Sequence, residues 1–292
     1  MGRSARRVAS LLLCGAAAAS SGRLAGAELL PEAELRTNCY NFPEDDFHRS
    51  NSVRNTYANS PHLMLGLGEP AVDFTLHDID GARWNLGEAL EAGQGKPVVL
   101  IFGMLTCPAY QGLDTGEDST NKWTYWHERG LVDNHRDKAI FVHVYGPEPH
   151  PAAPDLNFDA GTLLSNYWSV WRQPVTYADR LEKAKTIRGI THPDEVILPD
   201  YLTGNPYSSL NQPVWCSYAN GARSSILVAS DGHVFYQQGW LNTDEMGEAI
   251  DGYWEQDGQG TWSGSGIIPG PLSPAAKKDG KTAKAGRKPA TP

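Results

Sequence analysis

Apolar and polar positions alternate in the first organised part of the chain. Residues 72–76 alternate apolar with polar side chains, Asp80-Gly81 supplies a turn, and apolar positions resume at Trp84 and Leu86. Period-two alternation on both sides of a Gly-containing turn is typical of an antiparallel hairpin. We therefore expect two paired strands here.

Two continuous apolar runs follow, at residues 96–103 and 138–146. Runs of this length without alternation are typical of strands buried on both faces of an α/β sheet. Between them, Ser119-Thr120 can cap a helix that runs through residues 121–132. Together these elements predict a strand–helix–strand unit.

Shorter elements make up the second half of the chain. The pattern predicts a helix over residues 176–188, a strand over 195–198, a hairpin over 224–239 with its turn at Asp231-Gly232, and a closing helix over 244–254. A β-α-β unit followed by a β-β-α unit is the thioredoxin arrangement. We therefore expect an α/β, thioredoxin-like fold with an N-terminal β-hairpin extension and an insertion after the second central strand.

Both ends of the chain differ in composition from this central part. Residues 1–27 begin with arginines, continue through an apolar run and end in Ala25-Gly26-Ala27, an order typical of a cleaved signal peptide. The apolar run is too short to cross a bilayer, so we expect an exported protein with no membrane span after cleavage. The alternative is a retained anchor or an organelle transit peptide. The remaining divisions are an N-terminal arm at 28–66, the thioredoxin-like domain at 67–257 and a disordered basic tail at 258–292.

The charge balance argues against one class of partner. The formal charge is −9, but setting aside the signal segment and the tail from Gly270 leaves 15 basic and 33 acidic residues, a body of about −18. A body this acidic repels nucleic-acid phosphates and anionic membranes. We expect no nucleic-acid partner.

Three cysteines remain once residues 1–27 are removed: Cys39, Cys107 and Cys216. An odd number in an oxidising compartment leaves at least one thiol outside any stable disulfide. Cys39 and Cys216 either form a structural disulfide that ties the arm to the domain, or one of them resolves Cys107 during turnover.

Cys107 stands where the strand at residues 96–103 passes into a helix, directly before Pro108. The N–H groups and dipole of a helix N-terminus stabilise a thiolate, and Pro fits the first helical turn. We expect a rigidly held nucleophile whose sulfur faces solvent; the alternative is an inert core cysteine. Tyr110 stands where a dithiol motif would have its second Cys, so the site needs an external thiol reductant or a distant cysteine, and no cofactor.

Glu148 and His150 follow the second apolar run as Cys107 follows the first. Ligands bind outside the carboxyl ends of strands in such sheets, so these side chains are expected near one another. His150 can hold the thiolate as an ion pair or deliver a proton, with Glu148 orienting its imidazole; the alternative is a loop histidine without a role. The other histidines lack ligand spacing, so we predict no metal site.

Aromatic residues of the insertion supply candidate substrate contacts. Trp168 and Trp171 can wall an aromatic pocket by offset stacking, or they can pack a helix onto the body. Thr106 and Tyr110, on either side of Cys107, complete the expected substrate-binding set.

Two segments carry a resemblance to a known family. FGMLTCPAY, residues 102–110, resembles the active-site segment of the iodothyronine deiodinases, and Cys107 falls on their selenocysteine. VYGPEPHP, residues 144–151, is similar to the family's Val-Tyr-Ile-x-Glu-Ala-His segment and places Glu148 and His150 on its functional Glu and His. The resemblance covers roughly residues 68–254 but is dense only in such patches.

This resemblance implies a thioredoxin fold, a homodimer and reductive removal of halogen from a small halogenated aromatic substrate, which in the family is thyroxine deiodination. A chalcogenate attacks the halogen, His protonates the ring carbon, and thiols restore the enzyme. The chain departs from the family in having sulfur in place of selenium, Leu105 in place of an accessory Cys, and Pro174 in place of a second His. No proline stands at 223–225, where thioredoxin-like proteins keep a cis-proline.

Two other functions compete with this one. A peroxiredoxin-like thiol peroxidase shares the fold and the Cys-Pro helix start, but that family places Thr three residues before its Cys, where this chain has Met104. A non-catalytic thioredoxin-fold binding module predicts a buried Cys107 of ordinary reactivity.

Overall fold

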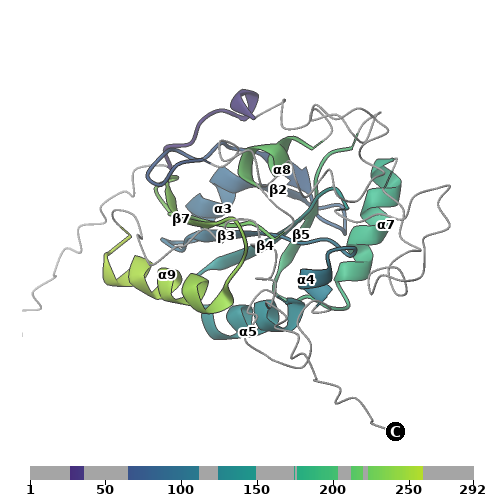
Figure 1. Ribbon diagram of the computed structural model, residues 1–292. Helices are drawn as coiled ribbons and strands as arrows, with labels where there is room; N and C mark the ends of the chain where they lie inside the picture. Colours follow the sequence, from purple (N-terminus) through teal and green to yellow (C-terminus); the bar gives the residue numbers. More distant parts are fainter. Residues whose placement is uncertain are drawn as a thin grey trace, which may run out of the picture.

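The computed structural model describes residues 27–35, 65–111, 124–148, 174, 176–202, 212–219 and 223–258. Its centre is a five-stranded sheet in the order β5-β4-β3-β6-β7 (Figure 1). The strands are β3 (Val98–Phe102), β4 (Ile140–Tyr145), β5 (Val196–Pro199), β6 (Ser225–Val228) and β7 (Val234–Gln238). β3, β4 and β5 are parallel, β6 is antiparallel to β3, and β7 is antiparallel to β6.

Alternate side chains of β3 enter two different cores. Val98, Leu100 and Phe102 pack with residues of α3 (Leu86–Ala92) and α8 (Pro213–Tyr218). Val99 and Ile101 pack with residues of α5 (Tyr125–His135) and α9 (Thr243–Glu255), on the other face (Figure 1). Because helices cover both faces, β3 has no solvent side, which explains its uninterrupted apolar sequence.

The predicted strands and helices occur in the predicted order. β3, α5 and β4 form the strand–helix–strand unit, and β6, β7 and α9 form the hairpin and closing helix. α7 (Tyr177–Ile187) packs against β5 at one end of the sheet (Figure 1). The protein therefore has a thioredoxin-like α/β fold. The expected insertion follows β4 and extends to about Pro174, and its residues 149–173 lie outside the described residues.

The N-terminal hairpin is confirmed, with one correction. β1 (Thr75–His77) and β2 (Arg83–Asn85) pair antiparallel. Leu86, expected to continue the second strand, instead begins α3. Asn85 causes the change, because its side-chain oxygen accepts a hydrogen bond from the Glu88 N–H and caps the helix.

Capping residues also set the start of other helices. Thr176 caps α7 through a reciprocal pair of hydrogen bonds with Asp179, as expected of a helix over 176–188. α5 begins after Thr124; the cap expected at Ser119-Thr120 lies outside the described residues. α8 was not anticipated, because six residues are too few to show a helical period.

Residues 68–79 cross the sheet from one outer strand to the other, and we call them the strap. At one end, Gly68 N–H donates to the Val234 carbonyl of β7 (2.8 Å), and Val234 N–H donates to the Glu69 carbonyl (2.9 Å). At the other end, Ile79 N–H donates to the Ile197 carbonyl of β5 (3.2 Å). The strap therefore holds both edges of the five-stranded sheet.

The start of the N-terminal arm lies against this strap. Leu30 N–H donates to the Ala71 carbonyl, and Asp73 N–H donates to the Leu30 carbonyl, both at 2.8 Å. Glu28 N–H donates to the Asp231 carbonyl (2.7 Å) in the β6–β7 turn. The predicted signal peptide and basic tail lie outside the described residues. Among the residues that the structure describes, no helix is long and apolar enough to cross a membrane.

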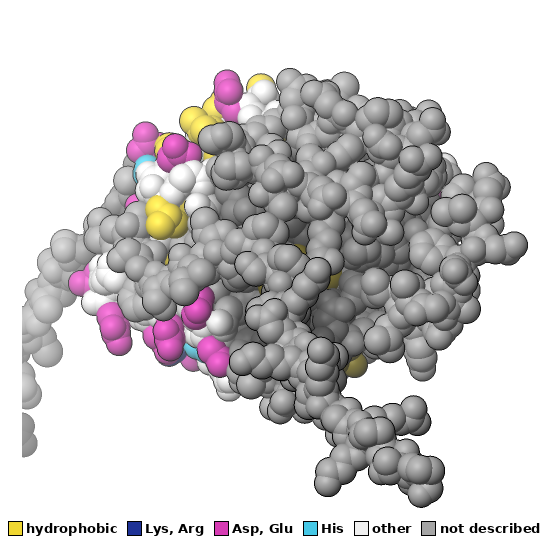
Figure 2. Space-filling view, viewed as in Figure 1, with side chains coloured by type: hydrophobic (Ala, Val, Ile, Leu, Met, Phe, Trp, Pro, Cys, Tyr) yellow, Lys and Arg dark blue, Asp and Glu magenta, His cyan; other side chains and the backbone are white. Residues whose placement is uncertain are grey.

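Acidic side chains gather over α9 on the face shown in Figure 2. The helix carries Asp244, Glu248 and Glu255 at exposed positions and has no basic residue along its length. This surface accounts for part of the negative charge that the composition assigns to the body of the protein.

Candidate functional site

Cys107 lies between the carboxyl end of β3 and the short helix α4 (Pro108–Gln111). Its N–H donates to the Met104 carbonyl (3.1 Å), and the Gln111 N–H donates to the Cys107 carbonyl (3.1 Å). These two bonds close the turn between strand and helix. Cys107 thus occupies the strand-to-helix position that the sequence predicts.

The Cys107 side chain is buried, with 1% of its surface exposed. It packs in an apolar cluster with Met104, Leu105, Tyr110 and Tyr145. The expectation that the sulfur faces solvent is therefore wrong. The turn after β3 directs the side chain inward, among residues of α4, β4 and α7, instead of presenting it at the surface.

The structure separates the roles of two cysteines. Cys107 carries a thiol and takes part in no disulfide. Cys216, buried in α8, is disulfide-bonded, and its partner lies outside the described residues. Cys216 is therefore not joined to Cys107 in this state. Cys39 is outside the described residues, so its pairing with Cys216 stays a prediction.

Glu148 is tied to the residue that precedes Cys107. One oxygen of its carboxyl group, Oε2, accepts hydrogen bonds from the Thr106 N–H (2.8 Å) and from Thr106 Oγ1 (2.7 Å). The other oxygen, Oε1, accepts a hydrogen bond from the Tyr145 hydroxyl. All three residues are fully or almost fully buried. The carboxyl group of Glu148 is therefore held against Thr106, the residue directly before the candidate nucleophile Cys107. Tyr145, which sequence reasoning did not single out, completes this arrangement.

Burial raises the pKa of Glu148 to about 7. The two hydrogen bonds from Thr106 oppose this shift, since they stabilise the carboxylate, and the positive charges of Lys183 and Arg180 oppose it further. A carboxyl group with this pKa holds and releases a proton near neutral pH. That is the property required of a general acid or base.

Tyr110 is turned into the interior and is fully buried. Its ring lies 4.7 Å from the guanidinium carbon of Arg223 and 5.6 Å from the His143 ring. Burial raises the pKa of its hydroxyl well above the usual value, so the group stays a neutral phenol. The structure thus places Tyr110 against charged side chains of the core and not on an exposed substrate-binding wall.

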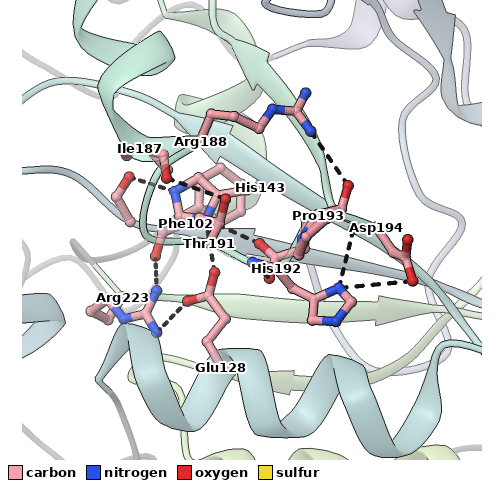
Figure 3. A network of polar contacts seen from close by, with 12 residues as sticks. Phe102, Glu128, His143, Ile187, Arg188, Thr191, His192, Pro193, Asp194 and Arg223 are labelled. Atoms are coloured by element: carbon pink, nitrogen blue, oxygen red, sulfur yellow. Dashed lines mark hydrogen bonds and ion pairs between the residues drawn. The ribbon is translucent and has the colours of Figure 1, made fainter.

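Four buried charged or titratable residues lie beneath α4, and we call them the quartet: Glu128, His143, Glu195 and Arg223. Arg223 Nη2 lies 2.7 Å from Glu128 Oε2, and His143 Nδ1 lies 2.9 Å from Glu128 Oε1. Figure 3 shows Glu128 of α5 facing Arg223, which precedes β6. Sequence reasoning missed the quartet. The one available signal was His143, a polar residue inside the apolar run of β4.

Two carboxyl groups of the quartet behave in opposite ways. Burial would raise the pKa of Glu128, but the positive charge of Arg223 and the contact with His143 hold it well below its usual range. Burial and the neighbouring Glu128 raise the pKa of Glu195 well above its usual range. Glu128 is therefore the anion of the quartet, and Glu195 is its neutral acid.

Three members of the quartet could in principle hold a metal ion. Glu128, His143 and Glu195 each bring one ligand atom within 4.8 Å of the others. Against this, Arg223 already neutralises Glu128, and His143 Nε2 contacts the Gly103 carbonyl at 2.8 Å. These contacts account for the cluster without a metal, and the prediction of no metal site stays untested.

The remaining candidate residues cannot be placed. His150, Trp168 and Trp171 lie outside the described residues. The structure therefore brings together Cys107, Thr106, Glu148 and Tyr110 at the carboxyl end of β3 and β4.

The described residues define a class: a thioredoxin-like α/β domain with a single cysteine at the start of the helix that follows the central strand. No protein-family model and no curated protein matches the sequence.

Solved structures match the chain at low identity and with low TM-scores. A thioredoxin-like protein from Aeropyrum pernix is 15% identical, with a TM-score of 0.38, over 62% of this chain and 89% of that one. A conserved protein from Geobacillus kaustophilus is 15% identical, with a TM-score of 0.42, over 66% and 84%. A peroxidoxin from Mycobacterium tuberculosis is 16% identical, with a TM-score of 0.36, over 64% and 97%.

Proposed function

We propose that the protein is a thiol-dependent reductive dehalogenase of the deiodinase type, acting on a small iodinated phenol. The observation that carries the proposal is the buried carboxyl group of Glu148, bonded to Thr106 directly before Cys107. Removing halogen from an aromatic ring needs a nucleophile for the halogen and a proton for the ring carbon. Cys107 and Glu148 can supply this pair, because Glu148 is hydrogen-bonded to the residue next to Cys107 although it follows a different strand.

The reaction balances with an external thiol as reductant. The Cys107 thiolate attacks iodine, a sulfur–iodine bond forms, and the carbon–iodine bond breaks with its electron pair left on carbon. The ring carbon takes a proton that Glu148 supplies, directly or through His150. One external thiol then displaces iodide to give a mixed disulfide, and a second thiol releases the Cys107 thiol and an external disulfide. The sum is one carbon–halogen bond reduced and two external thiols oxidised.

The environment of Glu148 suits it to deliver a proton. Its pKa of about 7, raised by burial, keeps a substantial fraction protonated at neutral pH. After the proton leaves, the carboxylate keeps three hydrogen-bond donors, two from Thr106 and one from Tyr145. Proton donation therefore leaves a stabilised anion, which supports Glu148 as the general acid.

One observation favours a second candidate, a non-catalytic binding module. Cys107 is only 1% exposed, and a buried thiol is the state expected of an inert core cysteine. For dehalogenation, the substrate must gain access to a sulfur that is covered in this structure. The two candidates therefore differ in whether Cys107 reacts at all.

The deciding experiment measures thiol-dependent iodide release from iodotyrosines and iodothyronines. We expect release by the wild type, none from Cys107→Ser, a loss of about 10²–10⁴-fold in kcat from Glu148→Gln, and faster release when selenocysteine replaces Cys107. A control variant, Glu182→Gln, removes an exposed carboxylate from α7 and should react like the wild type.

No iodide from the wild type, with Cys107 inert to alkylating reagents, would establish the binding module. No iodide with rapid consumption of peroxide would point to the thiol peroxidase.

A further inference from the structure

The quartet contacts the chain on both sides of Cys107. Ahead of it, at the end of β3, Arg223 Nη1 donates to the Phe102 carbonyl (3.1 Å), and His143 Nε2 lies 2.8 Å from the Gly103 carbonyl. Behind it, the ring of Tyr110 lies over Arg223 and beside His143. The same two side chains thus hold the backbone before Cys107 and the aromatic ring after it.

The close fit at Gly103 shows how tight this contact is. A Cβ atom at Gly103 would lie 2.7 Å from His143 Cε1 and 2.8 Å from Arg223 Nη1. A Cβ atom essentially never lies this close to an atom to which it is not bonded, so a side chain at position 103 would force His143 and Arg223 away from the backbone. The strand end and the quartet form one packed unit.

Two contacts tie His143 into the quartet. Its Nε2 faces the Gly103 carbonyl and its Nδ1 faces the Glu128 carboxylate. The guanidinium group of Arg223 is the fixed positive charge of the quartet, and it lies 2.7 Å from the Glu128 carboxylate.

We propose that the quartet is a positioning unit that fixes the turn carrying Cys107 and uses the positive charge of Arg223 to favour the Cys107 thiolate. Arg223 and His143 act through the chain and through Tyr110. Arg223 and His143 are therefore positioning residues. The inference rests on the proposed function only in taking Cys107 as the reactive group.

Charged and titratable groups from several elements surround this thiol. Tyr110 of α4 lies within electrostatic range of Cys107, Glu128, Glu195 and Arg223. Glu148, after β4, is linked through Thr106, and Arg180 and Lys183 of α7 act on Glu148. Burial of the sulfur and the proximity of Glu148 both disfavour the thiolate, whereas the positive charge of Arg223 favours it. Substitutions in the quartet should therefore change the pH at which the Cys107 thiol ionises.

The test uses two substitutions of opposite charge effect, Arg223→Gln and Glu128→Gln. The fraction of Cys107 ionised is followed against pH by thiolate ultraviolet absorbance, as the difference between each protein and its Cys107→Ser counterpart. Iodoacetamide alkylation at Cys107, located by mass spectrometry, gives a second readout. At an effective dielectric of about 20, a unit charge about 10 Å away moves a titration midpoint by about one pH unit.

We expect Arg223→Gln to raise the Cys107 midpoint by about one pH unit and Glu128→Gln to lower it by a similar amount. The Cys107 midpoints of Arg223→Lys and of the double variant Arg223→Gln/Glu128→Gln should both lie closer to that of the wild type. Arg136→Gln makes the same charge change at an exposed ion pair with Asp194, and should leave the midpoint in place. If the quartet has only a structural role, the Cys107 midpoint should shift in the same direction in both single variants, or in neither. Either result overturns the proposal.

Two further outcomes also decide the matter. If Arg223→Gln does not fold, Glu128→Gln alone is decisive, and a midpoint that stays or rises contradicts the inference. If the purified protein holds a stoichiometric metal ion that Glu195→Gln loses, the cluster is a metal site and not the unit proposed. No halogenated aromatic substrate enters these measurements, so a failure of the dehalogenase proposal leaves them interpretable.

Discussion

Gly103→Ala should destabilise the protein because the new methyl group has no room. Its Cβ would lie 2.7 Å from His143 Cε1 and 2.8 Å from Arg223 Nη1. Both side chains are bound to Glu128, at 2.9 and 2.7 Å, so neither can retreat without weakening a buried ion pair. Overpacking costs about 1–3 kcal/mol, and a weakened hydrogen bond to a charged group about 1.5–3 kcal/mol more. We expect the free energy of unfolding to fall by about 3–5 kcal/mol.

Urea denaturation followed by circular dichroism measures this change, and Gly130→Ala is the matched control. Gly130 lies inside α5, and a Cβ there would meet no atom within 4 Å. The control should gain about 0.5–1 kcal/mol, because Gly is a poor residue for a helix interior. If the free energy of unfolding of Gly103→Ala lies within about 0.5 kcal/mol of the wild-type value, His143 and Arg223 can move at little cost in free energy. The reasoning that they hold the Cys107 turn rigidly would then be refuted.

Three further predictions follow from the buried groups and caps. Burial raises the pKa of Glu148 in the folded protein to about 7 and that of Asp200 to about 6. In the unfolded chain both groups titrate near pH 4. Each group therefore contributes stability that is fully present below about pH 4 and is lost as pH rises through its folded pKa. The melting temperature should therefore fall between about pH 4 and pH 7, and an equal slope in Glu148→Gln would contradict this assignment. Tyr145→Phe removes a donor to the Glu148 carboxylate and should move the alkaline limb of the iodide-release profile up by about half to one pH unit; a limb that moves down would reverse the role given to Tyr145. Thr176→Ala removes the cap of α7 and should cost about 1 kcal/mol in urea denaturation without changing alkylation of Cys107, whereas an unchanged midpoint would mean that the cap contributes nothing.

The sequence predicted the parts of the fold that depend on local pattern. The runs at β3 and β4 are apolar throughout because both faces of the sheet are covered, and the Asp231-Gly232 turn fixes the β6–β7 hairpin. The strand-to-helix position of Cys107 follows from the same local pattern. The predicted second strand of the first hairpin is too long, because it includes Leu86. The side chain of Asn85 caps α3, and this hydrogen bond outweighs the alternating pattern that continues to Leu86.

The rest of the site depends on contacts between distant segments. Glu128, Glu195 and Arg223 each look like an ordinary surface residue in sequence. The packing of α5 brings Glu128 to His143, and the order of the strands brings Glu195 and Arg223, which precede β5 and β6. The burial of Cys107 has the same origin, since α4, β4 and α7 together decide whether its sulfur is covered. Local spacing contains no information on either point.

The strap has a consequence for how copies of this protein can meet. Outer strands of a sheet offer unpaired N–H and C=O groups, and they are the usual route to intermolecular strand addition and aggregation. Here the backbones of Gly68 and Glu69 are hydrogen-bonded to Val234 at one edge, and the backbone of Ile79 is hydrogen-bonded to Ile197 at the other. A second chain would have to displace the strap at either edge to extend the sheet there. A chain that begins at residue 80 would lack the strap, and we expect it to be more prone to strand-mediated association than the full chain.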